Sequence, residues 1–193
     1  MNPRTLPANF EVRAATISDL RRLAKLLAQS FHRSDNLLGL FHPLLHLMIY
    51  EDLRQRFTAG SRHYTCLVVI LHPSTHPEQN PVHRPGLIVG TVELGLRSRY
   101  PWQVSSLRKY LYISNLAVHP QFRRQGIAQD LLQRCEVVAR DWGFSALYLH
   151  VLENNDQAKQ LYTKLGYRLG SIDWSWNSLL LGQPRQMFLH KQF

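Results

Sequence analysis

Tyr112-Ile113-Ser114-Asn115-Leu116-Ala117-Val118-His119-Pro120-Gln121-Phe122-Arg123-Arg124-Gln125-Gly126-Ile127-Ala128 is the most informative stretch of this sequence. Its first half is typical of a buried strand, and its second half passes through a tight turn into a helix. Gly126 allows the backbone to approach an anion closely, and the N–H groups of residues 125–129 would point at that anion. Arg123 and Arg124 add positive charge at the rim. The stretch therefore predicts a phosphate-binding turn, with an ordinary strand-to-helix turn as the alternative.

A second segment follows after one more helix and one more strand: Asn155-Asp156-Gln157-Ala158-Lys159-Gln160-Leu161-Tyr162-Thr163-Lys164-Leu165-Gly166-Tyr167. In this order and at this spacing, the two segments resemble the acetyl-CoA-binding core of the GCN5-related N-acetyltransferases. The strict resemblance covers residues 111–167, and the N-terminal third matches only in pattern. It implies that the first segment binds the pyrophosphate of coenzyme A and that Tyr162 protonates the departing thiolate. A packed aromatic residue near a helix end is the alternative for Tyr162.

Length and composition predict one domain over residues 1–193, because 45% hydrophobic residues suffice for one full core. The longest uncharged apolar stretches fall short of the ~18 to 20 residues that span a bilayer, so no membrane partner is expected. Residues 1–9 have no apolar segment of the secretory type, and a cytoplasmic location is the expectation.

Cysteine and histidine usage predicts no metal and no disulfide. Cys66 and Cys135 are far apart and form no C-x-x-C pair. His72, His76 and His83 lie in a proline-rich stretch without carboxylate or thiolate partners, which argues against a metal site.

The formal charge of +10 favours an anionic partner. The candidates are the phosphates of coenzyme A, a ribosome or other nucleic acid, and an acidic substrate. The basic residues are scattered, and no aromatic-glycine signature of an RNA-binding sheet is present. Coenzyme A with a basic surface accounts for the charge, so we expect no specific nucleic acid, while proximity to a ribosome stays open.

Periodicity predicts an α/β fold. Strands are expected at 10–13, 64–71, 87–96, 111–118, 146–151, 167–172 and 185–190. Helices are expected after Thr16 and Ser18, at 43–57, from Ala128 to an end at Gly143, and at 156–165. This order predicts a mixed sheet with helices on its faces. The resemblance further implies a mostly antiparallel sheet whose central strands, 111–118 and 146–151, splay apart around the pantetheine.

The resemblance also implies where the cosubstrate, acetyl-CoA, is held. Backbone amides of residues 116–118 would face the thioester carbonyl, and Tyr162 would lie at the thiol end. The implied cofactor-binding set is Leu116, Ala117, Val118, Arg123, Arg124, Gln125, Gly126, Ile127, Ala128, Asn155 and Tyr162.

The base that accepts the amine proton has two candidates. Leu111-Tyr112-Ile113 and Tyr148-Leu149-His150-Val151 resemble protein N-terminal acetyltransferases of the NatE and NatF catalytic-subunit type. In those enzymes the tyrosine and histidine hold a water that takes the proton, which points to Tyr112 and His150 here. The alternative for His150 is a structural role, in which its ring hydrogen-bonds to a backbone carbonyl. Glu93 is the rival base, since many family members carry a glutamate on this central strand; otherwise it is one polar residue of an alternating strand.

The choice of acceptor depends on how easily its amine is deprotonated. An α-amino group has a pKa near ~8 and a lysine near ~10.4, so a neutral lysine costs roughly 3 kcal/mol more at the same pH. This favours a protein N-terminus, with transfer by direct attack in a ternary complex because no activated Cys or Ser is evident. The sequence also resembles chloroplast and cyanobacterial acetyltransferases that accept both amines. Alternatives are a lysine or small-molecule amine such as an arylalkylamine, with Glu93 as base, and a non-catalytic acyl-CoA-binding regulator.

Overall fold

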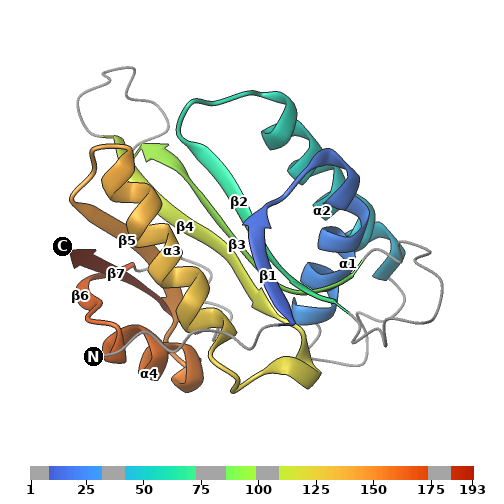
Figure 1. Cartoon of the computed structure of the whole chain (residues 1–193). Helices are drawn as coiled ribbons and strands as arrows, with labels where there is room; N and C mark the ends of the chain where they lie inside the picture. The colour runs from blue at the N-terminus through green and yellow to red at the C-terminus, as the bar shows by residue number, and fades with distance from the viewer. Residues whose placement is uncertain (1–8, 32–41, 73–85, 99–108, 174–183) are drawn as a thin grey trace. The chain divides into compact units, whose positions relative to one another are not determined.

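The computed structural model describes residues 9–31, 42–72, 86–98, 109–173 and 184–193. Figure 1 labels the elements of the chain. Short 3-10 turns at Ile17–Asp19 and Pro120–Phe122 precede α1 and α3. The helices and strands are β1 (Phe10–Ala14), α1 (Leu20–Phe31), α2 (His42–Thr58), β2 (Tyr64–Leu71), β3 (Leu87–Ser98), β4 (Lys109–Val118), α3 (Ile127–Asp141), β5 (Ala146–Leu152), α4 (Asp156–Lys164), β6 (Arg168–Asp173) and β7 (Gln186–Gln192).

The sheet has seven strands in the order β1-β2-β3-β4-β5-β7-β6. The chain forms two compact units, residues 1–93 with 115–132, and residues 94–114 with 133–193. Strands β3 and β4 contribute residues to both units. The mixed α/β class expected from periodicity is confirmed, and most expected elements differ from the observed ones by only one or two residues at each end.

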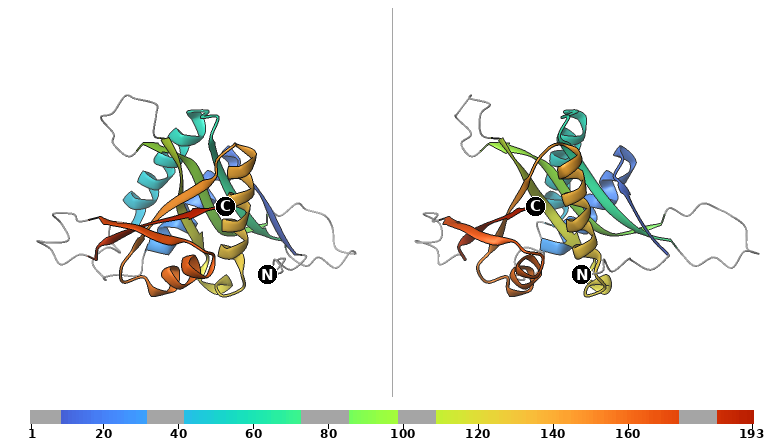
Figure 2. Two further views of the ribbon diagram at one scale, coloured as in Figure 1. Left: turned by 90° about the vertical axis from the view of Figure 1, so that its left-hand side faces the viewer. Right: turned by 60° about the vertical axis from the view of Figure 1, so that its left-hand side comes forward.

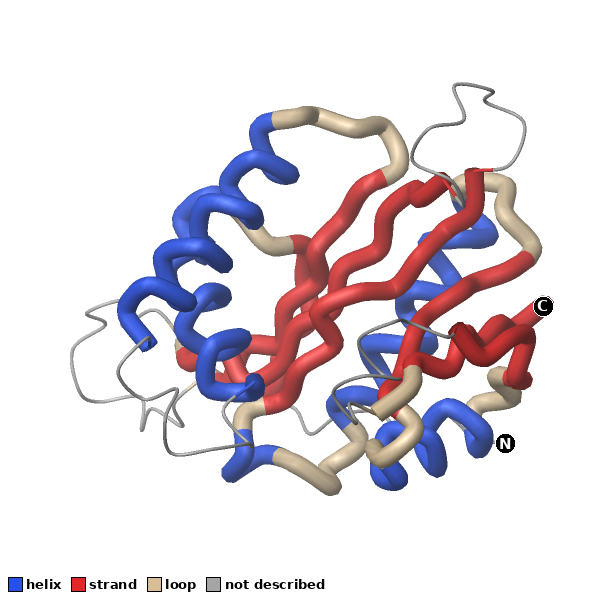
Figure 3. The backbone as a smooth tube through the Cα atoms, turned by 180° about the vertical axis from the view of Figure 1, so that it is seen from behind, coloured by secondary structure: helices blue, strands red, loops and turns tan. Residues whose placement is uncertain are grey.

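The first unit has helices against both faces of its strands. Strands β1 and β2 are antiparallel, with Val12 opposite Val69. One side of β2 presents Val68 and Ile70 to a core that includes Leu23 and Leu27 of α1, and Figure 3 shows α1 and α2 lying side by side. The other side packs against the start of α3, because a Cβ placed on Gly90 of β3 would meet Ile127, Leu131 and Val69.

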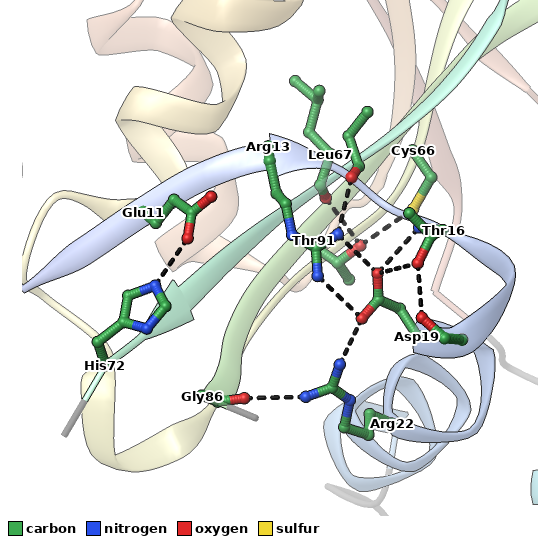
Figure 4. Close-up of polar contacts among 12 residues, drawn as sticks. Glu11, Arg13, Thr16, Asp19, Arg22, Cys66, Leu67, His72, Gly86 and Thr91 are labelled. Carbon is green, nitrogen blue, oxygen red and sulfur yellow. Dashed lines mark hydrogen bonds and ion pairs between the residues drawn. The ribbon is translucent and has the colours of Figure 1, made fainter. Parts of the chain in front are cut away.

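A buried carboxylate fixes the start of α1 in this unit. Asp19 is fully buried and accepts hydrogen bonds from Arg13, Arg22 and Thr16, as Figure 4 shows. Arg22 also donates to the carbonyl oxygen of Gly86, the residue that precedes β3. Burial alone would raise the pKa of Asp19, but the hydrogen bonds from Arg13 and Thr16 outweigh it and hold this pKa far below its usual range. Asp19 therefore stays ionised and joins β1, α1 and β3.

The second unit places β5 between a parallel and an antiparallel neighbour. Tyr112 of β4 pairs with Tyr148 of β5 in parallel, whereas β5 and β7 are antiparallel, with Leu149 opposite Leu189. In Figure 2, β7 is drawn in dark red, with β5 in orange and β6 in red-orange as its two neighbours. Along β5, Leu147, Leu149 and Val151 are buried on one face. Tyr148 and His150 consequently share the opposite face with residues of β4 and β7.

Candidate active site

The predicted phosphate turn lies in the first unit, between the end of β4 and the start of α3. Arg124 and Gly126 both have positive φ, 65° and 89°. Left-handed residues in a turn bring successive N–H groups to one concave side, which is a common anion-binding arrangement. A Cβ added to Gly126 would meet no described atom within 4 Å. The space beside the turn is therefore open, and glycine is needed there for its backbone conformation.

The first turn of α3 presents further N–H groups at this place. The first intrahelical hydrogen bond runs from the N–H of Asp130 to the carbonyl of Gly126, so the preceding N–H groups have no partner within the helix. Ile127 is buried and holds the helix start against β3. A Cβ on Gly90 would lie 2.6 Å from the Ile127 side chain, so Gly90 allows this close approach. Gly90 was not predicted from the sequence, although a glycine inside a strand often marks such a contact.

The side chains around the turn differ in their burial and in their contacts. Arg123 is half-buried and its Nε donates to the carbonyl oxygen of Val118 at 3.2 Å, which braces the turn against the end of β4. Arg124 and Gln125 are exposed. A turn with left-handed residues, a helix N-terminus and two arginines fits a pyrophosphate group, in charge and in the direction of its donors.

Glu93, the rival base, lies on β3 with every carboxylate oxygen engaged. Its Oε2 accepts hydrogen bonds from Arg56 Nη1 at 2.7 Å and from the Tyr64 hydroxyl at 3.2 Å. Its Oε1 accepts one from Asn115 Nδ2 at 2.7 Å. The glutamate is buried while Arg56 is part-exposed and also pairs with Asp52 of its own helix. Glu93 is thus one member of an ion-paired network rather than an isolated polar residue of an alternating strand.

The partners of Glu93 were not found by our sequence analysis. Arg56 is on α2 and Tyr64 on β2, far from Glu93 in sequence, so no local pattern pairs them. Asn115 could have been identified as an irregular position of the strand, because asparagine is depleted in strands and tolerates positive φ. It adopts φ 51° within β4.

Tyr112 and His150, the predicted base pair, meet in the second unit. The Tyr112 hydroxyl and His150 Nδ1 are 2.9 Å apart, in hydrogen-bond contact. The His150 ring packs on Phe188 of β7 with ring centroids 4.8 Å apart, and the Arg97 guanidinium lies 4.1 Å from the centroid of the Tyr112 ring. The parallel pairing of Tyr112 with Tyr148 explains the geometry, since His150 is two residues further along β5 on the same face. Arg97 and Phe188 were not predicted.

Tyr162, the predicted acid, lies on α4 in the same unit. It is buried, with an edge-to-face contact to Tyr167. Burial, with a smaller effect of Tyr112, raises the pKa of Tyr162 to about 12, so its hydroxyl is protonated at neutral pH. Asn155 is the N-cap of α4, and its side-chain oxygen accepts the N–H of Ala158. This cap positions the helix that carries Tyr162.

The described residues contain no group of three or more His, Cys, Asp or Glu side chains arranged to hold a metal ion. His72 pairs with Glu11 at 2.7 Å, and His76 and His83 lie outside the described residues. Within those same ranges no helix is long and apolar enough to cross a bilayer. Cys66 and Cys135 are both buried and form no disulfide, and burial raises the pKa of the Cys66 thiol to about 12.

Comparison with known proteins gives one consistent family. A model of the "Acetyltransferase (GNAT) family" matches residues 46–167. GCN5-related N-acetyltransferase 10, chloroplastic, of Arabidopsis thaliana is 26% identical over 91% of this chain and 68% of its own length. Thialysine N-epsilon-acetyltransferase of Bos taurus is 39% identical over 60% of this chain and 62% of its own. PaiA N-acetyltransferase from Thermoplasma acidophilum, solved in complex with coenzyme A, shares the fold with a TM-score of 0.67 at 16% identity, over 95% of this chain and 99% of that one.

Proposed function

Because this chain belongs to the acetyltransferase (GNAT) family, we propose that it transfers an acetyl group from acetyl-CoA to the α-amine of a protein N-terminus. The resemblance carried by the two sequence segments is confirmed at the level of the family. The narrower likeness to the NatE and NatF type is part of the proposal.

The observation that carries the proposal is the 2.9 Å contact between the Tyr112 hydroxyl and His150 Nδ1. A phenol and an imidazole held together can orient a water that takes the proton of the attacking amine. An α-amino group titrates near pH ~8, well below a lysine amine at ~10.4, so it is the amine that loses its proton more readily to such a water. Glu93 is the weaker candidate, because Arg56, Tyr64 and Asn115 already occupy both of its oxygens.

Tyr162 would support departure of the thiolate. A thiol has a pKa near ~8.5, so complete proton transfer from a phenol with a pKa of about 12 is uphill by roughly 5 kcal/mol. The Tyr162 hydroxyl therefore stabilises the developing negative charge on sulfur mainly as a hydrogen-bond donor. Its protonated form is the one that this task needs.

Transfer is proposed to be direct, from the thioester to the amine in a ternary complex. A covalent acyl-enzyme would need an activated nucleophile. Cys66 and Cys135 are buried, and the raised pKa of Cys66 keeps it as an unreactive thiol. The turn at residues 123–128 would hold the pyrophosphate through the N–H groups at the start of α3.

A survey of acceptors tests the function. Initial acetylation rates would be compared over peptides with varied first two residues, peptides with a blocked N-terminus and one free lysine, and arylalkylamines. We expect the free N-terminal peptides to be the best substrates by kcat/KM. A higher kcat/KM for lysine or for a small amine would refute the N-terminal assignment.

A small-molecule or lysine acceptor is the second candidate, and the relative named for thialysine acetylation supports it. A non-catalytic acyl-CoA-binding protein is the third. It would bind acetyl-CoA in calorimetry yet acetylate none of the three acceptor classes.

A further inference from the structure

Strand β4 contains a left-handed residue immediately before the segment proposed to face the thioester. Asn115 has φ 51° inside the strand Lys109–Val118. A residue other than glycine adopts this conformation only at a cost, and it persists where its surroundings hold it. Asparagine is among the residues that tolerate it best. This conformation changes the direction of the peptide groups that follow. In a regular strand those groups would point alternately to the two sides.

The side chain of Asn115 is tied down by a buried carboxylate. Its Nδ2 donates to Glu93 Oε1 at 2.7 Å, and the other oxygen of Glu93 accepts from Arg56 and Tyr64. A buried carboxylate is costly unless it is paired and hydrogen-bonded. The positive charge of the Arg56 guanidinium compensates the negative charge of the buried Glu93 carboxylate. Glu93 can therefore hold the side-chain amide of Asn115 in one place.

We propose that Arg56, Glu93 and Asn115 form a positioning network that keeps Asn115 left-handed and so directs the backbone N–H groups of residues 116–118. In this assignment Glu93 contributes to acetyl transfer by fixing the strand, and it is not the base. The inference rests on the proposed function, in which these N–H groups face the thioester carbonyl. Donors aimed at a developing oxyanion act only when they are oriented beforehand, and loss of one costs about 10² to 10³ in kcat.

The geometry allows an exchange of donor and acceptor as the test. Asn115→Asp keeps the size of the side chain and its tolerance of positive φ, but it places a second carboxylate against Glu93. Adding Glu93→Gln reverses the pair: the new amide nitrogen can donate to the new carboxylate, while the amide oxygen still accepts from Arg56 and Tyr64. The net charge of this double variant equals that of the wild type.

The measurements are kcat with the best acceptor, the Kd of acetyl-CoA by calorimetry, and the pH dependence of kcat. We expect Asn115→Asp to lower kcat at least tenfold with the Kd within about threefold of wild type, and the double variant to recover most of that loss. Glu93→Gln alone should lower kcat but leave the shape of the pH profile of kcat unchanged, because no base is lost. Arg54→Gln, which breaks an exposed pair with Glu51 on the same helix, is the matched control and should match wild type.

Four results would overturn the inference: wild-type kcat in Asn115→Asp, no recovery in the double variant, a changed pH profile of kcat in Glu93→Gln, or a parallel loss of kcat in Arg54→Gln. If Asn115→Asp fails to fold, Asn115→Gly provides the test, since glycine adopts positive φ without strain but lacks the side chain whose hydrogen bond to Glu93 fixes the backbone. It should then lose kcat without losing acetyl-CoA binding, and wild-type kcat would refute the network. A wild type inactive on every amine would instead refute the proposed function, and the inference with it.

Discussion

Replacing Asp19 with Asn should destabilise the protein strongly at neutral pH. The carboxylate is fully buried and accepts two hydrogen bonds from Arg13, at 2.7 and 3.1 Å, one from Arg22, and others from Thr16. An amide of the same size leaves two guanidinium groups facing one neutral acceptor and an N–H₂ donor. Breaking a buried ion pair on one side costs about 3 to 5 kcal/mol. For a chain of this length that corresponds to a fall in Tm of roughly 6 to 20 °C.

The pH dependence of stability follows from the direction of the Asp19 pKa shift. The pKa of Asp19 is lowered in the folded protein, so its contribution to the free energy of unfolding is fully present above the unfolded pKa, near ~3.9, and is lost as pH falls through the folded value. The difference in stability between wild type and Asp19→Asn should therefore be constant above pH ~5 and shrink below pH ~4.

Urea unfolding of both proteins from pH 7 to pH 3 measures this difference, and thermal unfolding at pH 7 measures Tm, both followed by circular dichroism. Glu51→Gln, which breaks an exposed pair with Arg54, is the control and should leave Tm within about 2 °C of wild type. A Tm for Asp19→Asn within the same 2 °C, or a stability difference that grows toward low pH, would refute the reasoning.

Three further predictions concern activity. Gly126→Asp puts a side chain and a negative charge on a residue with φ 89°, and calorimetry should show acetyl-CoA binding weakened by at least ~2 kcal/mol; unchanged affinity in a folded variant would contradict the phosphate turn. Tyr162→Phe should lower kcat roughly ten- to a thousandfold with little change in acetyl-CoA affinity; an unchanged kcat with chemistry rate-limiting would leave Tyr162 a packing residue. His150→Ala should lower kcat on an N-terminal peptide about tenfold or more and change the pH profile of kcat, whereas Glu93→Gln should leave the shape of that profile unchanged; the reverse result would make Glu93 the base.

The elements that the sequence predicted well are those with strong local periodicity. The apolar run at residues 64–71 is β2 with identical bounds, and the helix expected to end at Gly143 is α3, followed by Gly143 with φ 81°. The contact of Tyr112 with His150 also follows from local rules once β4 and β5 are taken as parallel neighbours, because side chains on a strand alternate with period two.

These local rules could not predict polar contacts between residues that are far apart in the sequence. Glu93 could be judged only as a polar residue in an apolar strand, which left a base and an alternating strand position as equal interpretations. Its partners Arg56 and Tyr64 come from α2 and β2, and a periodic pattern states which face a residue occupies but not which charge it meets. The same is true of Asp19, which the sequence did not single out: Thr16 and Ser18 indicated the helix start, but neither Asp19 nor its two arginines were predicted.

Asn115 shows how a local conflict can carry functional information. The apolar run around it predicts a strand, and asparagine is a poor strand residue that tolerates the left-handed region. Sequences that specify one fold are locally consistent almost everywhere, and the exceptions concentrate at functional or strained sites. Here the exception coincides with a φ of 51° and with a hydrogen bond to a buried, ion-paired glutamate. The strand tolerates Asn115 because Glu93 holds it, so the polar pair and the backbone conformation are one feature and should be lost together in Asn115→Asp, where two carboxylates replace their hydrogen bond.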